Sequence, residues 1–247
     1  MRATELIMGM PITVEICDHG ASDHMKQVFD YFRTVDERYS PYKETSELSA
    51  INNGLPKKEW SEEMRAVLGM CEETEQQTDG FFNIRHRGKL DPSGLVKGWA
   101  IQQAADQLCS KGYKNFYIEA GGDIQVYGNS LDNEGWRVGI RNPFNTQEVV
   151  KVIQLSDYAV ATSGTYIRGE HIYNPHNNNR PAQEAQSLTV IGPTIYDADR
   201  FATAAFAMGK QGMAFIDQLP GFEAYMITDQ QTAILTKGFE KYVVEAH

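Results

Sequence analysis

Residues 90–100 constrain the fold more than any other stretch, because a strand-like pattern changes there into a helical one. The segment breaks at Asp91-Pro92 and then places Lys97 between Gly94 and Gly98. Apolar residues next recur at positions 101, 104, 105 and 108, which is the spacing of one buried helix face, and this pattern stops at residue 112. We therefore expect a glycine-rich loop that leads into an amphipathic helix, with Lys97 in its first turn.

Such a junction can bind an anion, because a helix N-terminus presents free backbone N–H groups and the positive end of its dipole. A lysine in the first turn is unfavourable for the dipole unless it has an anionic partner, so Lys97 favours a phosphate site. Turn geometry alone also explains glycine and lysine at many junctions. By itself the segment leaves both interpretations open.

Charge and composition exclude several partners. The formal net charge of -10 argues against nucleic acid or an anionic membrane surface as the main partner, so any anion site must be local. No window has the length and apolarity of a membrane span, and the N-terminus has no signal-peptide pattern. We expect no membrane insertion.

The cysteines favour a reducing compartment. Three are present, Cys17, Cys71 and Cys109, without Cys-x-x-Cys spacing. Cys71 and Cys109 fall on the apolar faces of expected helices, so we interpret them as buried thiols. Together with the absent leader pattern, this sparse, odd set predicts a cytoplasmic protein.

Strand-like and helical segments alternate without regular βαβ repetition. Helical patterns begin at Ser22, Ser61 and Asp197, and residues 40–52 form an expected polar loop. Strand patterns cover residues 12–16, 115–119, 124–127, 136–140, 149–155, 158–161, 186–191, 222–228 and 232–236. We predict one α+β domain over residues 1–247, with a largely antiparallel sheet packed with helices.

Two further groups of residues could carry chemistry. Asp199 and Thr203 are four residues apart on an expected helix and so share one face, where their oxygens suit Mg²⁺. Helix capping by Asp197 or Asp199, with Thr203 bonded back to a carbonyl, explains the same residues. His171 could act as a general base, and His86 and His176 are equal rivals by composition. No common nucleotide-binding motif is present, so a phosphate site would belong to a less common architecture.

Nine short motifs occur in an order that resembles the ApbE family of FAD:protein FMN transferases. They cover nearly the whole chain, and their ordered occurrence is more specific than any one of them. The motifs are MGM (8–10), SELSAIN (46–52), GFF (80–82), SGLVKGWA (93–100), EAGGDI (119–124), WRVGIRNP (136–143), ATSG (161–164), HIYNP (171–175) and DADRFATA (197–204).

This resemblance implies a T-fold-like α+β architecture and a Mg²⁺-dependent enzyme with FAD as its substrate. Such an enzyme splits the FAD pyrophosphate, passes FMN to a Thr or Ser hydroxyl of a partner flavoprotein, and releases AMP. Charge that builds on the phosphoryl oxygens during this cleavage must be neutralised, and a cation, Lys97 and loop amides would do so.

The resemblance also assigns residues. It implies that Asp199 and Thr203 bind Mg²⁺ through side chains, with carbonyls from Ala202 and Gly94. Lys97 would lie beside the metal and the pyrophosphate, and His171 would be the base for the incoming hydroxyl. The implied FAD site comprises Met8, Asn52, Gly94, Lys97, Glu119, Ala120, Gly121, Gly122, Thr162, Ser163 and Gly164.

Some positions depart from the family pattern and keep alternatives open. Asn174 stands where Asp is usual in the family, which removes a carboxylate close to His171 in the sequence. Asn83 likewise replaces a common Asp after the GFF motif. A FAD pyrophosphatase that uses water as the acceptor and a non-catalytic flavin-binding protein are therefore the alternatives to a transferase.

Overall fold

A computed structural model describes residues 1–86, 88–165, 172–177, 180–181 and 184–245. Its centre is an eight-stranded sheet in the order β1-β2-β5-β6-β9-β12-β13-β14, and all neighbouring strands in it are antiparallel. The strands are β1 (Arg2–Ile7), β2 (Met10–Ile16), β5 (Phe116–Ala120), β6 (Asp123–Tyr127), β9 (Ala159–Gly164), β12 (Ala185–Gly192), β13 (Glu223–Thr228) and β14 (Ala233–Leu235). The prediction of an α+β fold with a largely antiparallel sheet is confirmed.

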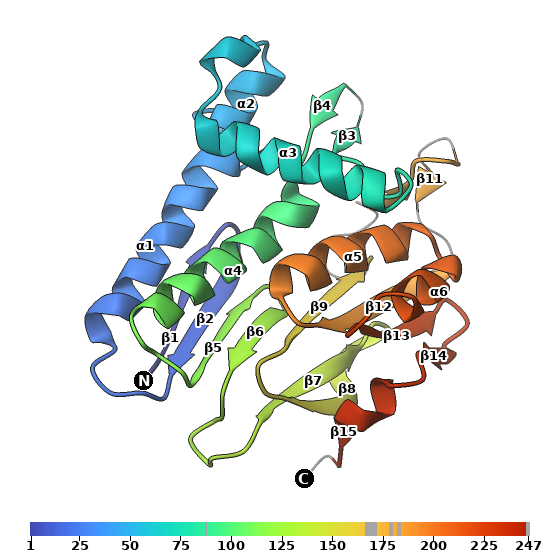
Figure 1. Cartoon of the computed structure of the whole chain (residues 1–247). Coiled ribbons are helices and arrows are strands. Elements are labelled where there is room, and N and C mark those ends of the chain that lie inside the picture. Colours follow the sequence, from blue (N-terminus) through green and yellow to red (C-terminus); the bar gives the residue numbers. More distant parts are fainter. Residues whose placement is uncertain (87, 166–171, 178–179, 182–183, 246–247) are drawn as a thin grey trace.

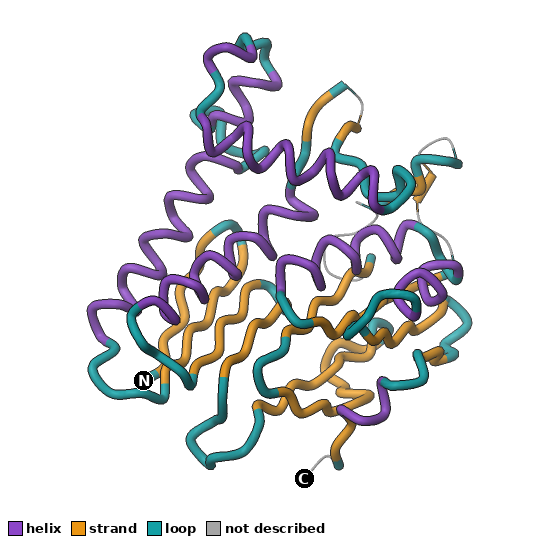
Figure 2. Tube along the Cα trace, in the orientation of Figure 1, coloured by secondary structure: helices purple, strands orange, loops and turns teal. Residues whose placement is uncertain are grey.

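Helices cover one face of this sheet (Figures 1 and 2). Those nearest the sheet are α1 (Ser22–Tyr39), α4 (Ser93–Ser110), α5 (Ile195–Ala207) and α6 (Gln211–Asp217). Farther from it lie α2 (Glu47–Asn52), a 3₁₀ turn (Lys57–Glu59), α3 (Glu62–Gln77) and the short hairpin β3 (Arg85–His86) and β4 (Lys89–Leu90). Buried apolar side chains of the helices and the sheet form one large core between these layers.

A second, smaller sheet packs on the opposite face. It contains β7 (Trp136–Asn142), β8 (Asn145–Leu155) and β15 (Val243–Val244), which follows a 3₁₀ turn (Phe239–Tyr242). Its inward residues, such as Val138 and Ile153, form a second core with Val126 and Ile191 of the large sheet. A further short hairpin joins β10 (Tyr173–Asn174) and β11 (Arg180–Pro181).

Two tight turns meet at one end of the large sheet. Met8 and Gly9, both with positive φ, connect β1 to β2, and Gly121 and Gly122 connect β5 to β6 in the same way. The Gly121 N–H donates to the Pro11 carbonyl at 3.2 Å, so the turns lie side by side. Strand β1 is an addition to the sequence prediction, which began the sheet at residue 12.

The expected polar loop over residues 40–52 is partly wrong, because its second half forms α2. Ser46 caps this helix by accepting a hydrogen bond from the Ser49 N–H, and Leu48 and Ile51 turn inward. Two buried apolar side chains three residues apart are too short a pattern to distinguish a helix from a loop by sequence alone.

Two more local predictions need correction. Ser22 is the first residue of α1 rather than a side-chain cap. Cys109 is exposed, because it lies beyond the buried stripe that Ala105 and Leu108 form, whereas Cys71 is buried as predicted. None of the described helices is both long and apolar enough to cross a lipid bilayer.

Candidate functional site

Helices α4 and α5 cross at an unusually close contact made by glycines. A Cβ atom at Gly98 would lie 2.6 Å from the Asp199 Cβ and 2.7 Å from the Ile195 carbonyl oxygen. A Cβ atom at Gly94 would lie 3.1 Å from the Thr203 Cγ2 atom. The i, i+4 glycines of α4 therefore face the i, i+4 pair Asp199 and Thr203 of α5, and the two motifs that the sequence singled out meet.

This contact overturns the expected glycine-rich loop. Residues 93–98 are helical, since α4 begins at Ser93, and Lys97 falls in its second turn. The Gly98 N–H donates to the Asp199 Oδ2 atom at 2.8 Å. This amide therefore binds a carboxylate of the protein itself. The glycines are needed for close helix packing, a role that sequence spacing does not distinguish from a turn.

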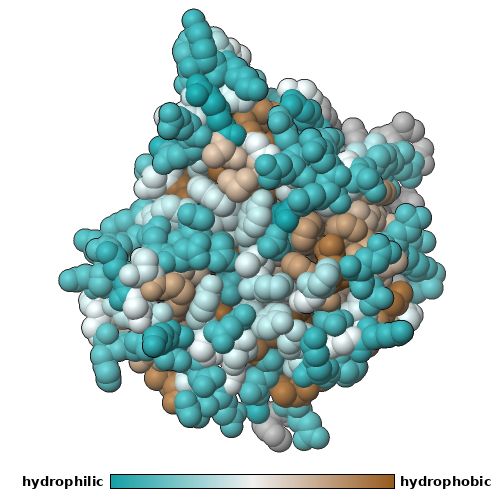
Figure 3. All heavy atoms as spheres, viewed as in Figure 1, coloured by the Kyte–Doolittle hydropathy of each residue, from teal (hydrophilic) through white to brown (hydrophobic). Residues whose placement is uncertain are grey.

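Asp199 lies in an apolar setting. Ten of the thirteen residues of α5 are buried, Asp199 included, and apolar side chains gather over this helix in Figure 3. Burial raises the pKa of the Asp199 carboxyl above its usual value; the Lys97 ammonium and the Gly98 N–H oppose this rise, and the Asp123 carboxyl adds to it. A carboxylate held in such a place gains most from a cation beside it.

Lys97 lies between two carboxylates. Its Nζ atom is 2.6 Å from the Asp123 Oδ2 atom and 3.7 Å from the Asp199 Oδ1 atom. The side chains of Asp123 and Asp199 are 1% and 4% exposed, and that of Lys97 is 15% exposed. One ammonium therefore serves two buried carboxylates, and the three groups together carry a net charge of about -1 when all are ionised.

Sequence reasoning missed Asp123 as a site residue, although the quoted motif EAGGDI contains it. Asp123 begins β6, and its Oδ1 atom accepts the Thr162 N–H of β9 at 3.1 Å. A single carboxylate thus connects β6, β9 and α4. Its position directly after the two turn glycines was the available signal, since such a residue lies at the end of a sheet where ligands commonly bind.

Most of the residues that the resemblance assigned to FAD binding lie around the two tight turns and on β9. Glu119 accepts the Gly122 N–H at 3.0 Å and so fixes the β5–β6 turn, which Ala120 enters. Met8 forms the neighbouring turn. Thr162, Ser163 and Gly164 end β9 beside β12, with the Thr162 and Thr189 hydroxyls 2.9 Å apart.

Asn52 has a structural task in this fold. Its side-chain amide bonds to both backbone groups of Leu90, donating to the carbonyl at 2.9 Å and accepting the N–H at 2.7 Å. Asn52 therefore fixes α2 to the strand that leads into α4. Its role in FAD binding stays a prediction.

The candidate base His171 lies outside the described residues. Its two rivals have partners of their own: His86 packs against the Tyr173 ring, with centroids 4.3 Å apart, and the His176 Nε2 atom lies 2.7 Å from the Asp79 carbonyl oxygen. The Asn174 side chain accepts the His176 N–H at 2.9 Å. The identity of the base stays a prediction.

The donor atoms at the α4–α5 crossing fit a magnesium ion. Asp199 Oδ1 is not the oxygen that Gly98 uses, and the Thr203 hydroxyl lies 3.4 Å from the Gly94 carbonyl oxygen. Ala202, whose carbonyl is the fourth expected ligand, precedes Thr203 within α5. Mg²⁺ prefers such oxygen donors, completed by water and phosphate. Among the described residues, no group of three or more His, Cys, Asp or Glu side chains is placed to hold a metal ion.

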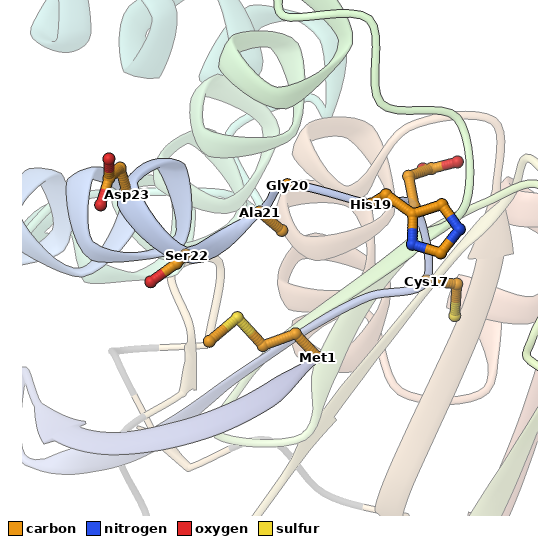
Figure 4. Close-up of a pocket in the computed structure, with 8 residues that line it drawn as sticks. Met1, Cys17, His19, Gly20, Ala21, Ser22 and Asp23 are labelled. Atoms are coloured by element: carbon orange, nitrogen blue, oxygen red, sulfur yellow. The ribbon is translucent and has the colours of Figure 1, made fainter.

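Two cavities lie outside the group formed by Lys97, Asp123 and Asp199. One of about 430 Å³ is lined by Met1 and residues 17–23 (Figure 4). It adjoins the Ile16 end of β2, roughly 20 Å along the strand from the Met10 end, which carries the turns. The other, of about 260 Å³, is lined by α3, α4 and the start of α5, with Met70, Trp99 and Tyr196 among its walls. Neither cavity includes Lys97, Asp123 or Asp199 in its lining.

Comparisons with known proteins show the family to which the chain is similar. The sequence pattern of the ApbE family matches residues 8–88 and 84–226. The FAD:protein FMN transferase of Vibrio cholerae is 34% identical over 143 residues, which are 53% of this chain and 43% of that protein. The Haemophilus influenzae protein of the same name is 28% identical over 162 residues, covering 60% and 46%. The chain thus spans about half the length of the curated relatives it matches.

Solved structures agree in fold over almost the entire chain. The flavin transferase ApbE from Vibrio cholerae superposes with a TM-score of 0.83 at 22% identity and covers 98% of both chains. The ApbE protein from Thermotoga maritima gives a TM-score of 0.86 at 21% identity and covers 99% of both. At this identity the two structures bear on the fold alone.

Proposed function

The chain belongs to the ApbE family, and from that premise we propose that it transfers FMN from FAD to a Thr or Ser hydroxyl of a partner flavoprotein, releasing AMP. The curated relatives carry the name FAD:protein FMN transferase, and the chain spans less than half of their length. The observation that carries the proposal is the crossing of α4 and α5, where Lys97, Asp199 and Thr203 come together.

This arrangement supports chemistry on a diphosphate. Cleavage of the FAD pyrophosphate builds negative charge on the phosphoryl oxygens and on the departing phosphate. We propose that Asp199 and Thr203, with the carbonyls of Gly94 and Ala202, hold Mg²⁺. When bound, Mg²⁺ neutralises this charge and orients the diphosphate.

Lys97 would supply the second positive charge. Its side chain is 15% exposed, and its ammonium lies 2.6 Å from Asp123 and 3.7 Å from Asp199. In the proposed complex it contacts the diphosphate as a point charge. The narrow Gly94–Gly98 contact keeps Asp199 and Lys97 within 3.7 Å of each other.

The two turns would hold the flavin dinucleotide. Gly122 has open space beside its Cα atom next to Asp123, which allows a ligand to approach the backbone closely, whereas the Met10 side chain lies against Gly121. We propose that Met8, Glu119 to Gly122 and Thr162 to Gly164 line this site. We further propose His171 as the base that takes the proton of the acceptor hydroxyl.

Asn174 keeps a pyrophosphatase as the second candidate function. It stands where a carboxylate is usual in the family, three residues after His171 in the sequence, so transfer to a protein hydroxyl could be impaired while cleavage of FAD persists. In that case water would accept the FMN group. For either function we propose a cytoplasmic location, which the sparse cysteines favour.

The test is an incubation with FAD, Mg²⁺ and a candidate acceptor flavoprotein. A matched acceptor in which the target Thr or Ser is replaced by Ala is the control. We expect AMP release together with covalent flavin fluorescence on the intact acceptor only. Free FMN without labelled acceptor would instead support the pyrophosphatase, and binding of FAD without AMP release would leave a non-catalytic flavin-binding protein.

A further inference from the structure

We propose that Asp123 is a positioning residue that keeps the Lys97 ammonium away from Asp199, so that Asp199 stays available to a divalent cation. This inference rests on the proposed function, because it concerns the carboxylate assigned there to Mg²⁺. It gives a role to a side chain to which the sequence analysis had assigned none.

The distances show how unequal the two ion pairs are. The Lys97 Nζ atom lies 2.6 Å from the Asp123 Oδ2 atom and 3.7 Å from the nearest oxygen of Asp199. That nearest oxygen is Oδ1, whereas Oδ2 accepts the Gly98 N–H. Lys97 therefore bonds to Asp123 and only approaches the Asp199 oxygen that a cation would use.

Without Asp123 the same lysine would compete with the cation. Lys97 is largely buried, and an ammonium in such a place moves toward the nearest carboxylate. Asp199 Oδ1 is 3.7 Å away, so a small rotation of the flexible lysine stem brings the two into contact. A divalent cation would then have to displace an ammonium from its principal ligand.

Asp123 is itself held firmly enough to act as such an anchor. Its carboxylate is 1% exposed, and its Oδ1 atom accepts the Thr162 N–H of β9. It begins β6 directly after the Gly121-Gly122 turn and pairs with Ala120 across that turn. The backbone of Asp123 is therefore held in the large sheet by its pairing within β6, and the anchor cannot follow the lysine.

The decisive comparison is Asp123→Asn, measured by isothermal titration of the purified protein with Mg²⁺, and with Mn²⁺ as a second probe. Asparagine retains an acceptor for the Thr162 N–H but loses the negative charge that holds Lys97. We expect the cation to bind about 10- to 100-fold more weakly than to the wild type, as is usual when a residue that orients a ligand is lost.

A second pair of variants separates positioning from direct attraction of the cation. Lys97→Met removes the competing ammonium, so it should bind Mg²⁺ at least as tightly as the wild type. In that background Asp123→Asn should weaken Mg²⁺ binding far less than it does when Lys97 is present. An equal or larger loss in the Lys97→Met background would overturn the proposal, because Asp123 would then act on the cation directly.

Asp18→Asn is the matched control. Asp18 also accepts backbone N–H groups, those of Lys114 and Asn115, but it lies at the opposite end of the sheet. It should leave Mg²⁺ affinity unchanged while altering thermal stability. Unchanged Mg²⁺ affinity in Asp123→Asn would also overturn the inference. Absence of any Mg²⁺ or Mn²⁺ binding to the wild type would instead refute the metal site of the proposed function.

Discussion

The two halves of α4 pack by opposite means. The C-terminal half presents Ile101, Ala104, Ala105 and Leu108 to the core, all at most 1% exposed, as an amphipathic helix normally does. The N-terminal half meets α5 through Gly94 and Gly98 and brings Lys97 beside two buried carboxylates.

The two halves of α4 therefore contribute differently: the C-terminal half stabilises the fold, and the N-terminal half positions the candidate site. Glycine inside a helix and a carboxylate inside a core both reduce the stability of a fold. Residues 93–98 contain two glycines and pack against the two buried carboxylates, Asp123 and Asp199, whereas the next three turns of α4 follow ordinary packing rules. A segment that departs from those rules in several ways at once is where function is most reasonably sought. Substitutions in the two halves should therefore affect different properties.

The largest effect on activity is expected for Asp199→Asn. This change keeps an acceptor for the Gly98 N–H but removes the proposed cation ligand, so AMP release from FAD should fall by about 10³-fold. The melting temperature should stay equal or rise, because Lys97 and Asp123 then form a balanced pair. Asp106→Asn on the exposed face of α4 is the control, and AMP release at the wild-type rate in Asp199→Asn would reject the metal mechanism.

Gly98→Ala should combine a loss of stability with a loss of activity. The new methyl group would lie 2.6 Å from the Asp199 Cβ atom, so α4 and α5 must move apart. We expect about 1–3 kcal/mol of destabilisation in urea unfolding. AMP release should fall by about 10²-fold, because a shift near 1 Å misplaces the reacting groups.

Gly69→Ala in α3 is the matched control for this helix contact. Its Cβ atom would meet nothing within 4 Å, so the change should stabilise the protein by about 0.5–1 kcal/mol. Equal stabilities of Gly98→Ala and Gly69→Ala would contradict the close contact between α4 and α5.

Leu108→Ala tests the other half of α4. Leu108 is 1% exposed within the main core, so its truncation should destabilise the fold by about 2–5 kcal/mol. AMP release per folded molecule, measured well below the melting temperature, should change less than in Gly98→Ala. A greater loss of activity than in Gly98→Ala would show that the two halves are not separable.

The smallest effect is expected for Cys109→Ser. Cys109 follows Leu108 but points away from the core and is exposed. Its replacement should change the free energy of unfolding by less than about 0.5 kcal/mol and leave AMP release unchanged. Rapid labelling of the native protein by a thiol reagent at Cys109, with Cys71 protected, would verify the difference in exposure between the two thiols.

The periodicity of apolar residues predicted the core correctly. The faces of α1, α3 and α4 and most strands of the large sheet follow from it, because burial and spacing are linked directly. The short helix α2 was missed, since six residues give too little periodicity. Strand β1 was missed because it lies at the edge of the sheet and most of its residues are not buried.

The site was only partly accessible from the sequence. Asp199 and Thr203 share a face by spacing alone, but their contact with Gly94 and Gly98 joins residues about a hundred positions apart. The glycines were interpreted as a loop, because sequence does not say whether a glycine serves a turn or a close helix contact. Asp123 escaped notice because its importance depends on Lys97, which only the folded chain brings within 2.6 Å.

A crystal structure with Mn²⁺ and FAD, located by anomalous scattering, would test the central claim most directly. The account predicts an anomalous peak within bonding distance of the Asp199 and Thr203 side chains, with the FAD diphosphate beside Lys97. Mn²⁺ and FAD bound together at another place, such as the cavity lined by Cys17 and His19, would contradict it.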